Sequence, residues 1–96
     1  MYVVTLTYTR PLDEVEKHRD AHMDWVRHQY ENGHFLVSGP RIPREGGVIL
    51  VRDMPRENLD ALLTEDPYQR NGVADYTVVW FKVTNAAADL QQLLER

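Results

Sequence analysis

The N-terminal stretch "MYVVTLTYT", residues 1–9, is rich in β-branched and aromatic side chains, which is typical of a β-strand. The stretch "DYTVVWFKV", residues 75–83, has a similar composition. In both stretches apolar side chains fall at odd and at even positions, so each strand carries them on both faces. An antiparallel sheet with one face in water alternates polar and apolar residues more regularly. These two stretches therefore predict a sheet that is covered on both faces.

The segments between and beyond these strands complete the set of expected elements. Asp13, with Glu16 three residues later, matches a capping box at a helix start, and Gly33 suits the position just after a helix end. Pro55 suits the first turn of a second helix. In chain order, the expected elements are a helix from residue 13 to about 31–33, a strand at 34–39, a loop at 40–47, a strand at 48–53, a helix at 55–66, a turn at 66–72 and a short terminal helix in "AAADLQQLLER".

The resulting order, β-α-β-β-α-β followed by a short C-terminal helix, is the ferredoxin-like pattern of an α+β fold. Residues 1–96 suit a single domain with one core. In this fold the third strand lies between the first and second in an antiparallel sheet, and both helices cover one sheet face. The terminal helix is too short to cover the whole of the other face. We therefore expect a homodimer whose sheet faces pack together.

The composition excludes several classes of function. The 11 basic and 15 acidic residues are interleaved along the chain and give a net charge of -4, so no nucleic acid is expected as a partner. No apolar run approaches the roughly 20 residues of a membrane span. The N-terminus lacks the pattern of a signal peptide, and there is no cysteine for a disulfide, a thiol nucleophile or a Cys-based zinc site. We expect a cytoplasmic protein that makes no contact with a membrane.

The motif "HRDAH", residues 18–22, places two histidines on the helix face that should meet the sheet. The same face carries Val15, Arg19, Val26 and Gln29, with Trp25 at its edge. A histidine enclosed there could simply donate a hydrogen bond to a backbone carbonyl. It could also bind a metal, or act as an acid or base. The helical periodicity alone leaves these three interpretations open.

The metal interpretation is the weaker one for this motif. Histidines four residues apart can share one ion, as in HExxH, but Arg19 occupies the position next to the first histidine where that motif has a glutamate. A third ligand would have to come from Asp66, His28 or His34. We therefore predict no metal site. Nothing in the chain resembles a phosphate-binding glycine loop or a dinucleotide fingerprint, so no organic cofactor is predicted either.

Three short motifs resemble those of the YCII-related (YciI-like) family: "RDAHMDWV" on the first helix, "GHFLVSGP" at the second strand and "EDPYQRNGV" after the second helix. The resemblance implies a dimeric α+β barrel built from ferredoxin-like subunits. It places a proposed catalytic His–Asp pair on His22 and Asp66. It also implies that a substrate pocket is lined by four further residues, Arg19, Ser38, Gly39 and Tyr68. One enzyme of the family is a dehydrochlorinase of a chlorinated hydroxyquinol, so the resemblance extends to lyase chemistry.

The residues themselves support the pairing. Asp66 ends the second helix on the helix-covered side of the sheet, where its carboxylate could accept the proton of one His22 nitrogen and leave the other free as a base. Ser38 has no separate base beside it, so we interpret it as a hydrogen-bond donor to substrate; a bond from its hydroxyl to the backbone is the alternative. Tyr68 could instead fill the core. Arg41 and Arg44 lie in the loop, where they could close over an anionic substrate, but we favour solvated charges for both.

The sequence therefore predicts a small enzyme that uses His22 as a general acid or base on a small cyclic, oxygenated molecule, as a lyase or isomerase. Two alternatives stay open: a non-catalytic module that binds a small metabolite, and an accessory subunit with a vestigial pocket. A catalytic histidine needs open space beside its free nitrogen. A structural histidine would have both nitrogens bonded to protein.

Overall fold

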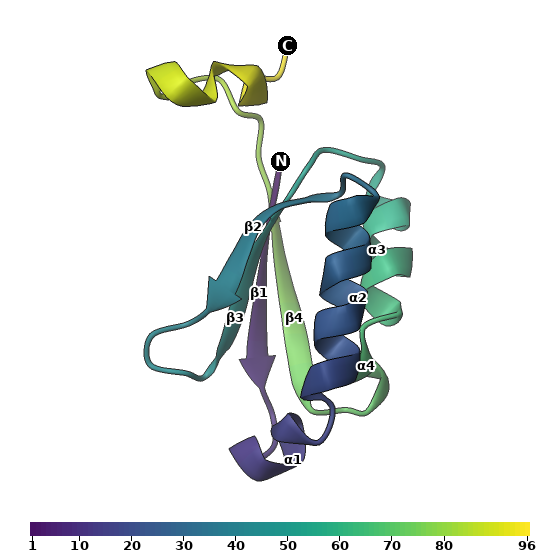
Figure 1. The fold of residues 1–96 in the computed structure, drawn as a ribbon. Helices are drawn as coiled ribbons and strands as arrows, with labels where there is room; N and C mark the ends of the chain where they lie inside the picture. The colour runs from purple at the N-terminus through teal and green to yellow at the C-terminus, as the bar shows by residue number, and fades with distance from the viewer.

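The computed structural model describes residues 1–96, and Figure 1 shows the order of its elements. The strands and helices follow the expected β-α-β-β-α-β order, with each crossover containing two helical pieces. In chain order they are β1 (Tyr2–Tyr8), α1 (Leu12–Glu16), α2 (Arg19–Glu31), β2 (Phe35–Pro40), β3 (Gly46–Val51), α3 (Arg56–Thr64), α4 (Pro67–Arg70), β4 (Ala74–Trp80) and the 3₁₀ helix η1 (Ala88–Leu93).

The four strands form one antiparallel sheet in the order β2-β3-β1-β4. The third strand thus lies between the first and the second, which confirms the predicted α+β fold. A register shift between Phe35 and Val37 marks an irregularity in the pairing of β2 with β3. No helix is both long enough and apolar enough to span a membrane.

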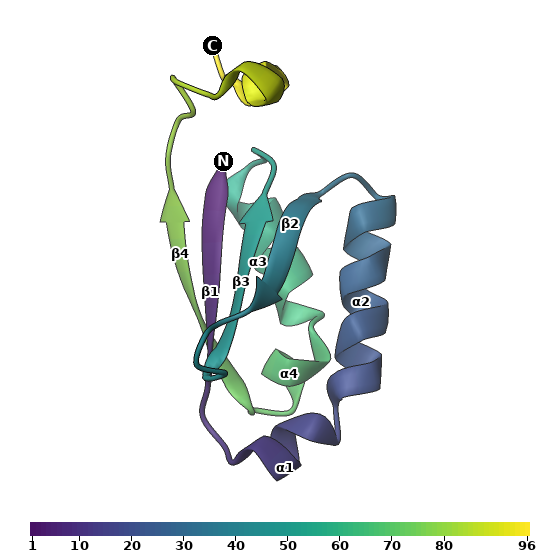
Figure 2. The ribbon, with the colours of Figure 1, turned by 60° about the vertical axis from the view of Figure 1, so that its left-hand side comes forward.

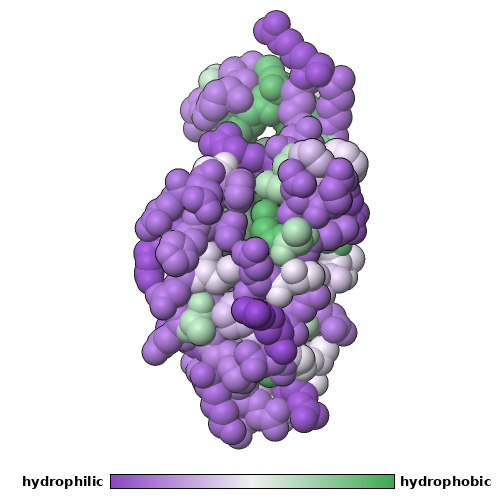
Figure 3. All heavy atoms as spheres, turned by 90° about the vertical axis from the view of Figure 1, so that its right-hand side faces the viewer, coloured by the Kyte–Doolittle hydropathy of each residue, from purple (hydrophilic) through white to green (hydrophobic).

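Helices α2, α3 and α4 all lie against the same face of the sheet, as Figures 1 and 2 show from two directions. Alternate residues of β1, starting at Tyr2, are buried beneath them. On the helix side the core includes Leu59 and Trp25, both buried. The outward surface of the helices is largely hydrophilic, with only small hydrophobic spots (Figure 3). This layer arrangement is that of amphipathic helices packed on a sheet.

The opposite face of the sheet has no helix on it. The strand register aligns Val37, Leu50, Val3 and Val79, which form one apolar row across all four strands. Val37 and Val79 at the two ends of this row are 57% and 56% exposed. The two-sided apolar pattern of the strands therefore corresponds to a core on one face and an uncovered apolar row on the other.

The first expected helix is divided into α1 and α2, so the prediction of one helix starting at Asp13 is wrong. The His18 N–H donates to the Val15 carbonyl at 3.0 Å, a three-residue bond that closes α1, and His18 itself has non-helical angles (φ -110°, ψ 6°). The capping box does not form either, because α1 starts after Pro11 and Asp13 lies inside it. The break lets α1 lie at the end of the sheet while α2 runs along its face (Figure 2).

The segment expected as a turn at residues 66–72 contains α4, a single helical turn. Asp66 is its N-cap, because one carboxylate oxygen accepts the Tyr68 N–H at 3.0 Å. Pro67 occupies the first helical position, where its fixed φ is favourable. The cap at Asp66 and the proline after it together start this short helix. The sequence analysis interpreted Asp66 only as the end of the preceding helix.

Gly46 at the start of β3 allows a close approach to β1. A side-chain Cβ at this position would lie 1.8 Å from the Leu6 carbonyl oxygen. We expect Gly46→Ala to lower the free energy of unfolding by about 2–4 kcal/mol, because backbone must move to relieve this overlap. Gly39→Ala is the matched control, since a Cβ there meets nothing within 4 Å. Urea unfolding of both variants checks this, and equal midpoints would contradict it.

Candidate active site

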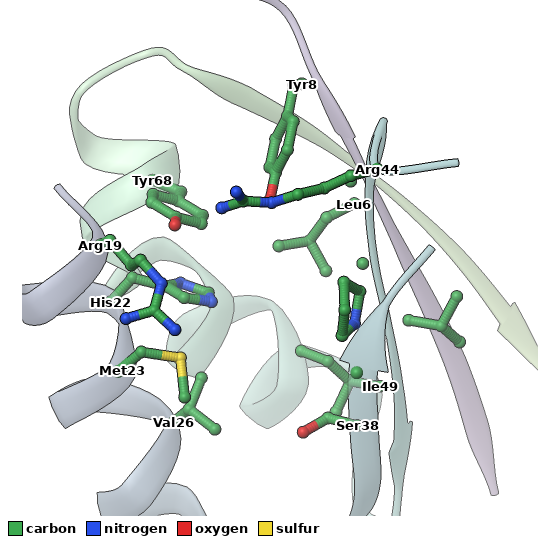
Figure 4. A pocket seen from close by; sticks show the side chains of 15 residues that line it. Leu6, Tyr8, Arg19, His22, Met23, Val26, Ser38, Arg44, Ile49 and Tyr68 are labelled. Carbon is green, nitrogen blue, oxygen red and sulfur yellow. The ribbon is translucent and has the colours of Figure 1, made fainter. Parts of the chain in front are cut away.

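A cavity of about 390 Å³ lies between α2 and the sheet, at the end of the molecule where β2 and β3 are joined by their loop. Its walls come from α2, from β1, β2 and β3, from the β2–β3 loop and from α4. Figure 4 shows the labelled side chains of α2 and α4 on one side and those of the strands on the other. The cavity lies on the helix-covered face, so its position follows directly from the packing of α2 on the sheet.

His22 and Asp66 form a buried pair on the α2 side of this cavity. The Nδ1 atom of His22 lies 2.6 Å from Oδ1 of Asp66, the contact that the sequence analysis expected. Asp66 is fully buried and His22 is 9% exposed. An ionised carboxylate only accepts hydrogen bonds, so we assign the ring hydrogen to Nδ1. His22 Nε2 has no protein partner, and the ring lines the cavity.

The Tyr68 ring fixes the orientation of the His22 ring. The two rings stack with centroids 3.8 Å apart and an angle of 7° between their planes. Tyr68 is buried and also lines the cavity, so it fills the core and faces the site at the same time. Burial is the main cause that raises the pKa of the Tyr68 hydroxyl to about 12. The hydroxyl therefore stays protonated near neutral pH and is able to donate a hydrogen bond.

Ser38 and Gly39 lie on β2, on the opposite side of the cavity from His22. The Ser38 hydroxyl lies 2.7 Å from the Tyr30 hydroxyl, and no histidine or carboxylate is bonded to it. This arrangement lacks the base that a serine nucleophile needs. Gly39 pairs with Val48, on the sheet face opposite to the buried Ile49, so a Cβ at Gly39 would point away from the cavity into open space. Gly39 therefore lines the cavity with its backbone.

Three arginines near the cavity have different surroundings. Arg19, at the start of α2, lines the cavity. Arg44 also lines it and forms an ion pair with Glu16, although the sequence analysis assigned it to solvent. The hydrogen bond to Glu16, followed by one to Tyr8, raises the pKa of the Arg44 guanidinium. Arg41 instead donates to the Thr7 hydroxyl at 3.3 Å and is absent from the cavity lining.

The remaining histidines do not join the site. His34 Nδ1 contacts the Gln29 side-chain oxygen at 2.8 Å, and His18 sits at the N-cap of α2. No three His, Asp or Glu side chains come together where they could hold one metal ion. The sequence analysis considered His18 and His22 as two ligands of one metal ion. The structure places no third ligand beside them.

Tyr8 and Leu6 line the cavity, although the sequence analysis did not select them. The alternation of β1 could have identified both residues, because residues 2, 4, 6 and 8 share the sheet face that the helices cover. The loop that carries Arg44 has no such periodicity. Its contribution to the cavity depends on how the loop folds back toward α1.

A model of the YCII-related domain matches residues 1–82, which is most of the chain. The chain belongs to the YCII-related family. Among solved structures, the 5-chloro-2-hydroxyhydroquinone dehydrochlorinase TftG from Burkholderia phenoliruptrix AC1100, in complex with 2,5-dihydroxybenzoquinone, is similar in fold. The TM-score is 0.71 at 16% identity, over 86% of this chain and 95% of that chain. A search of the curated proteins found no match.

The geometry of this YCII-related site predicts the tautomer of His22. We expect long-range ¹H–¹⁵N correlation spectra of the neutral ring to show a protonated Nδ1 and an unprotonated Nε2, because Asp66 accepts the Nδ1 hydrogen. In Asp66→Ala, which removes the acceptor, the spectrum should shift toward the mixture seen for exposed imidazoles. His28, exposed on the same helix, is the internal control. A wild-type His22 protonated at Nε2 alone would contradict the assignment.

Proposed function

We propose that this chain is a single-domain enzyme in which His22 acts as general acid and base on a small cyclic, oxygenated molecule, in a lyase or isomerase reaction. The observation that carries the proposal is the state of the His22 ring. One nitrogen is held by a buried carboxylate, while the other has no protein partner and belongs to a residue lining an open cavity. A purely structural histidine would have both nitrogens bonded to protein.

Each neighbour of His22 has a role that follows from its position. Asp66 fixes the tautomer and would stabilise the imidazolium formed when Nε2 takes a proton. Stacking on Tyr68 restricts rotation of the ring, so Nε2 keeps its direction. The Tyr68 hydroxyl, the Ser38 hydroxyl and the Arg19 guanidinium are donors for substrate oxygens. Gly39 borders the substrate position with its backbone.

Cavity size and the structural neighbour agree with this substrate class. A volume of about 390 Å³ falls within the range of small-molecule sites. TftG is a dehydrochlorinase whose structure holds 2,5-dihydroxybenzoquinone, a ring with several oxygens. The identity between the two chains is 16%, so the shared fold supports the size and shape of the site rather than the reaction itself.

An elimination at such a site needs only acid–base chemistry. His22 Nε2 carries a proton from the ring hydroxyl next to the C–Cl bond to the chlorine-bearing carbon of a chlorinated hydroxyquinol, which gives the keto tautomer. Nε2 then takes the proton of a second ring hydroxyl, whose oxygen becomes the second quinone carbonyl as the ring electrons shift, and chloride leaves with the electron pair of the C–Cl bond. The net change is loss of HCl, with no external oxidant or reductant. An isomerisation would instead return the proton from Nε2 to another ring atom.

We place this chemistry in the cytoplasm, where a chain without cysteines has no need of an oxidising compartment.

Replacement of His22 separates catalysis from binding. We expect His22→Gln to lower the turnover of a chlorinated hydroxyquinol, followed as chloride release, by about 10²–10⁴-fold, because the general base is lost. Affinity for 2,5-dihydroxybenzoquinone should change much less. His28→Gln, on the exposed side of the same helix, is the control and should keep full turnover. Tight binding with no turnover in the wild-type protein would favour the non-catalytic binding module instead.

We also propose that two copies of the chain pack through the uncovered sheet face. The row of Val37, Leu50, Val3 and Val79 runs across every strand, and no element of the chain lies over it. A second copy related by a two-fold axis would bury this row against the same row. Burial of about 1,600 Å² in total is typical of a stable pair.

A charge within this row should separate the two copies. Val79→Lys places an ammonium on the 56% exposed valine of β4, so an apolar interface would have to bury an unpaired charge. We expect sedimentation at micromolar concentration to change from a dimer to the 11.2 kDa monomer. Leu12→Lys, at an exposed leucine of α1, is the control and should remain dimeric. A wild-type monomer would refute the proposal.

A further inference from the structure

The Arg19 guanidinium has no ion pair and no hydrogen-bond partner, and among the arginines without a carboxylate partner (Arg19, Arg52, Arg70 and Arg96) it alone lines the cavity. Other arginines are neutralised locally. Arg10, Arg27 and Arg56 each pair with a carboxylate three or four residues along the chain. One turn after Arg19 stand His22 and Met23, which both line the cavity and carry no negative charge. Glu16, one turn before it, is engaged by Arg44. The charge of Arg19 is therefore uncompensated at the edge of the cavity.

The cavity as a whole is positive although the chain is acidic. Its 15 lining residues include Arg19 and Arg44 but no aspartate or glutamate, whereas the chain has a net charge of -4. Asp66 lies behind the His22 ring, is fully buried and is engaged by both His22 and the Tyr68 N–H. A concave site lined by one sign of charge attracts ligands of the opposite sign.

The two guanidinium groups enter from opposite sides. Figure 4 shows Arg19 extending from α2 in front of His22, and Arg44 extending from the β2–β3 loop toward Tyr8 and Tyr68. Arg44 donates a hydrogen bond to Glu16, which holds it in place. Arg44 is thus partly neutralised and positioned, while Arg19 keeps a full free charge beside the base.

From this arrangement we propose that the substrate is a ring carrying an ionised oxygen, either an enolate-type ring oxygen or a carboxylate, and that Arg19 binds this oxygen while Arg44 closes the opposite side. The proposal rests on the proposed function, because it uses the same cavity. It adds the charge of the substrate, which the His–Asp pair alone does not specify. It also gives Arg19 a second role, since negative charge that develops on a ring oxygen would lie near its guanidinium.

Three ring compounds test the charge requirement by calorimetric titration. 2,5-Dihydroxybenzoquinone supplies ionised ring oxygens, its dimethyl ether supplies the same ring without charge, and a dihydroxybenzoate supplies a carboxylate. We expect at least one anion to bind the wild-type chain about tenfold or more tightly than the neutral ether, with affinity falling as salt is raised. The anion that binds more tightly identifies the source of the charge.

Variants of the arginines show which guanidinium binds the negative charge of the ligand. Arg19→Gln should weaken binding of the preferred anion by about 10–100-fold and leave the neutral ether unchanged, and Arg19→Lys should restore part of the affinity. Arg44→Gln should have a smaller effect in the same direction. Arg27→Gln is the control, because Arg27 lies on the same helix, pairs with Asp24 and is absent from the cavity lining. Thermal unfolding of each variant verifies that the fold is kept.

The outcomes distinguish this proposal from the catalytic one. Equal affinity for the anions and the neutral ether, or an anion affinity that Arg19→Gln leaves unchanged in a folded protein, would overturn it. Failure of all three rings to bind the wild-type chain would overturn it as well. Binding of an anion that depends on Arg19, in a chain whose His22→Gln variant turns over as the wild type does, would support the anionic ligand and refute the general base.

Discussion

The hydrogen bond between His22 and Asp66 is the contact on which the site depends. It joins residues 44 positions apart in the chain and lies in the interior between α2 and the start of α4. The same carboxylate oxygen caps α4 by accepting the Tyr68 N–H, and this cap places the Tyr68 ring flat against the imidazole. A buried carboxylate is costly unless it is hydrogen-bonded, so Asp66 requires both donors. One acidic residue therefore sets the helix start, the tautomer and the ring orientation together.

The sheet contributes both backbone and side chains to the site. β2 and β3 form one wall of the cavity with small residues and proline together with Val48 and Ile49, opposite the histidine. The close approach of Gly46 to Leu6 keeps β3 and β1 aligned at that end. The other face of the same strands carries an apolar row that has no role in the cavity. Successive side chains of a strand point to opposite faces, so one strand can serve both a site and an interface.

Charge is distributed unevenly between the surface and the cavity. Arg10, Arg27 and Arg56 are paired with nearby carboxylates, as expected for solvated residues whose pairs contribute little to stability. The cavity keeps arginines and tyrosine hydroxyls and excludes acids other than the one behind His22. The fold shared with TftG at 16% identity shows that this scaffold tolerates extensive substitution. Any ligand specificity that we propose for this chain is accordingly assigned to these few polar groups rather than to the scaffold.

The sequence by itself determined the order of the elements, the α+β class, and the helix face that meets the sheet. These features depend on local periodicity and composition, as in residues 1–9 and in the spacing of His22 from Val26. The contact of His22 with Asp66 was expected from the resemblance and from topology, because both helices had to cover one face. The tertiary structure decided the rest. The break at His18 and the helical turn after Asp66 depend on capping bonds between residues three and two positions apart. The position of Arg44 at the cavity depends on its contact with Glu16, 28 positions away. No periodic pattern encodes these contacts.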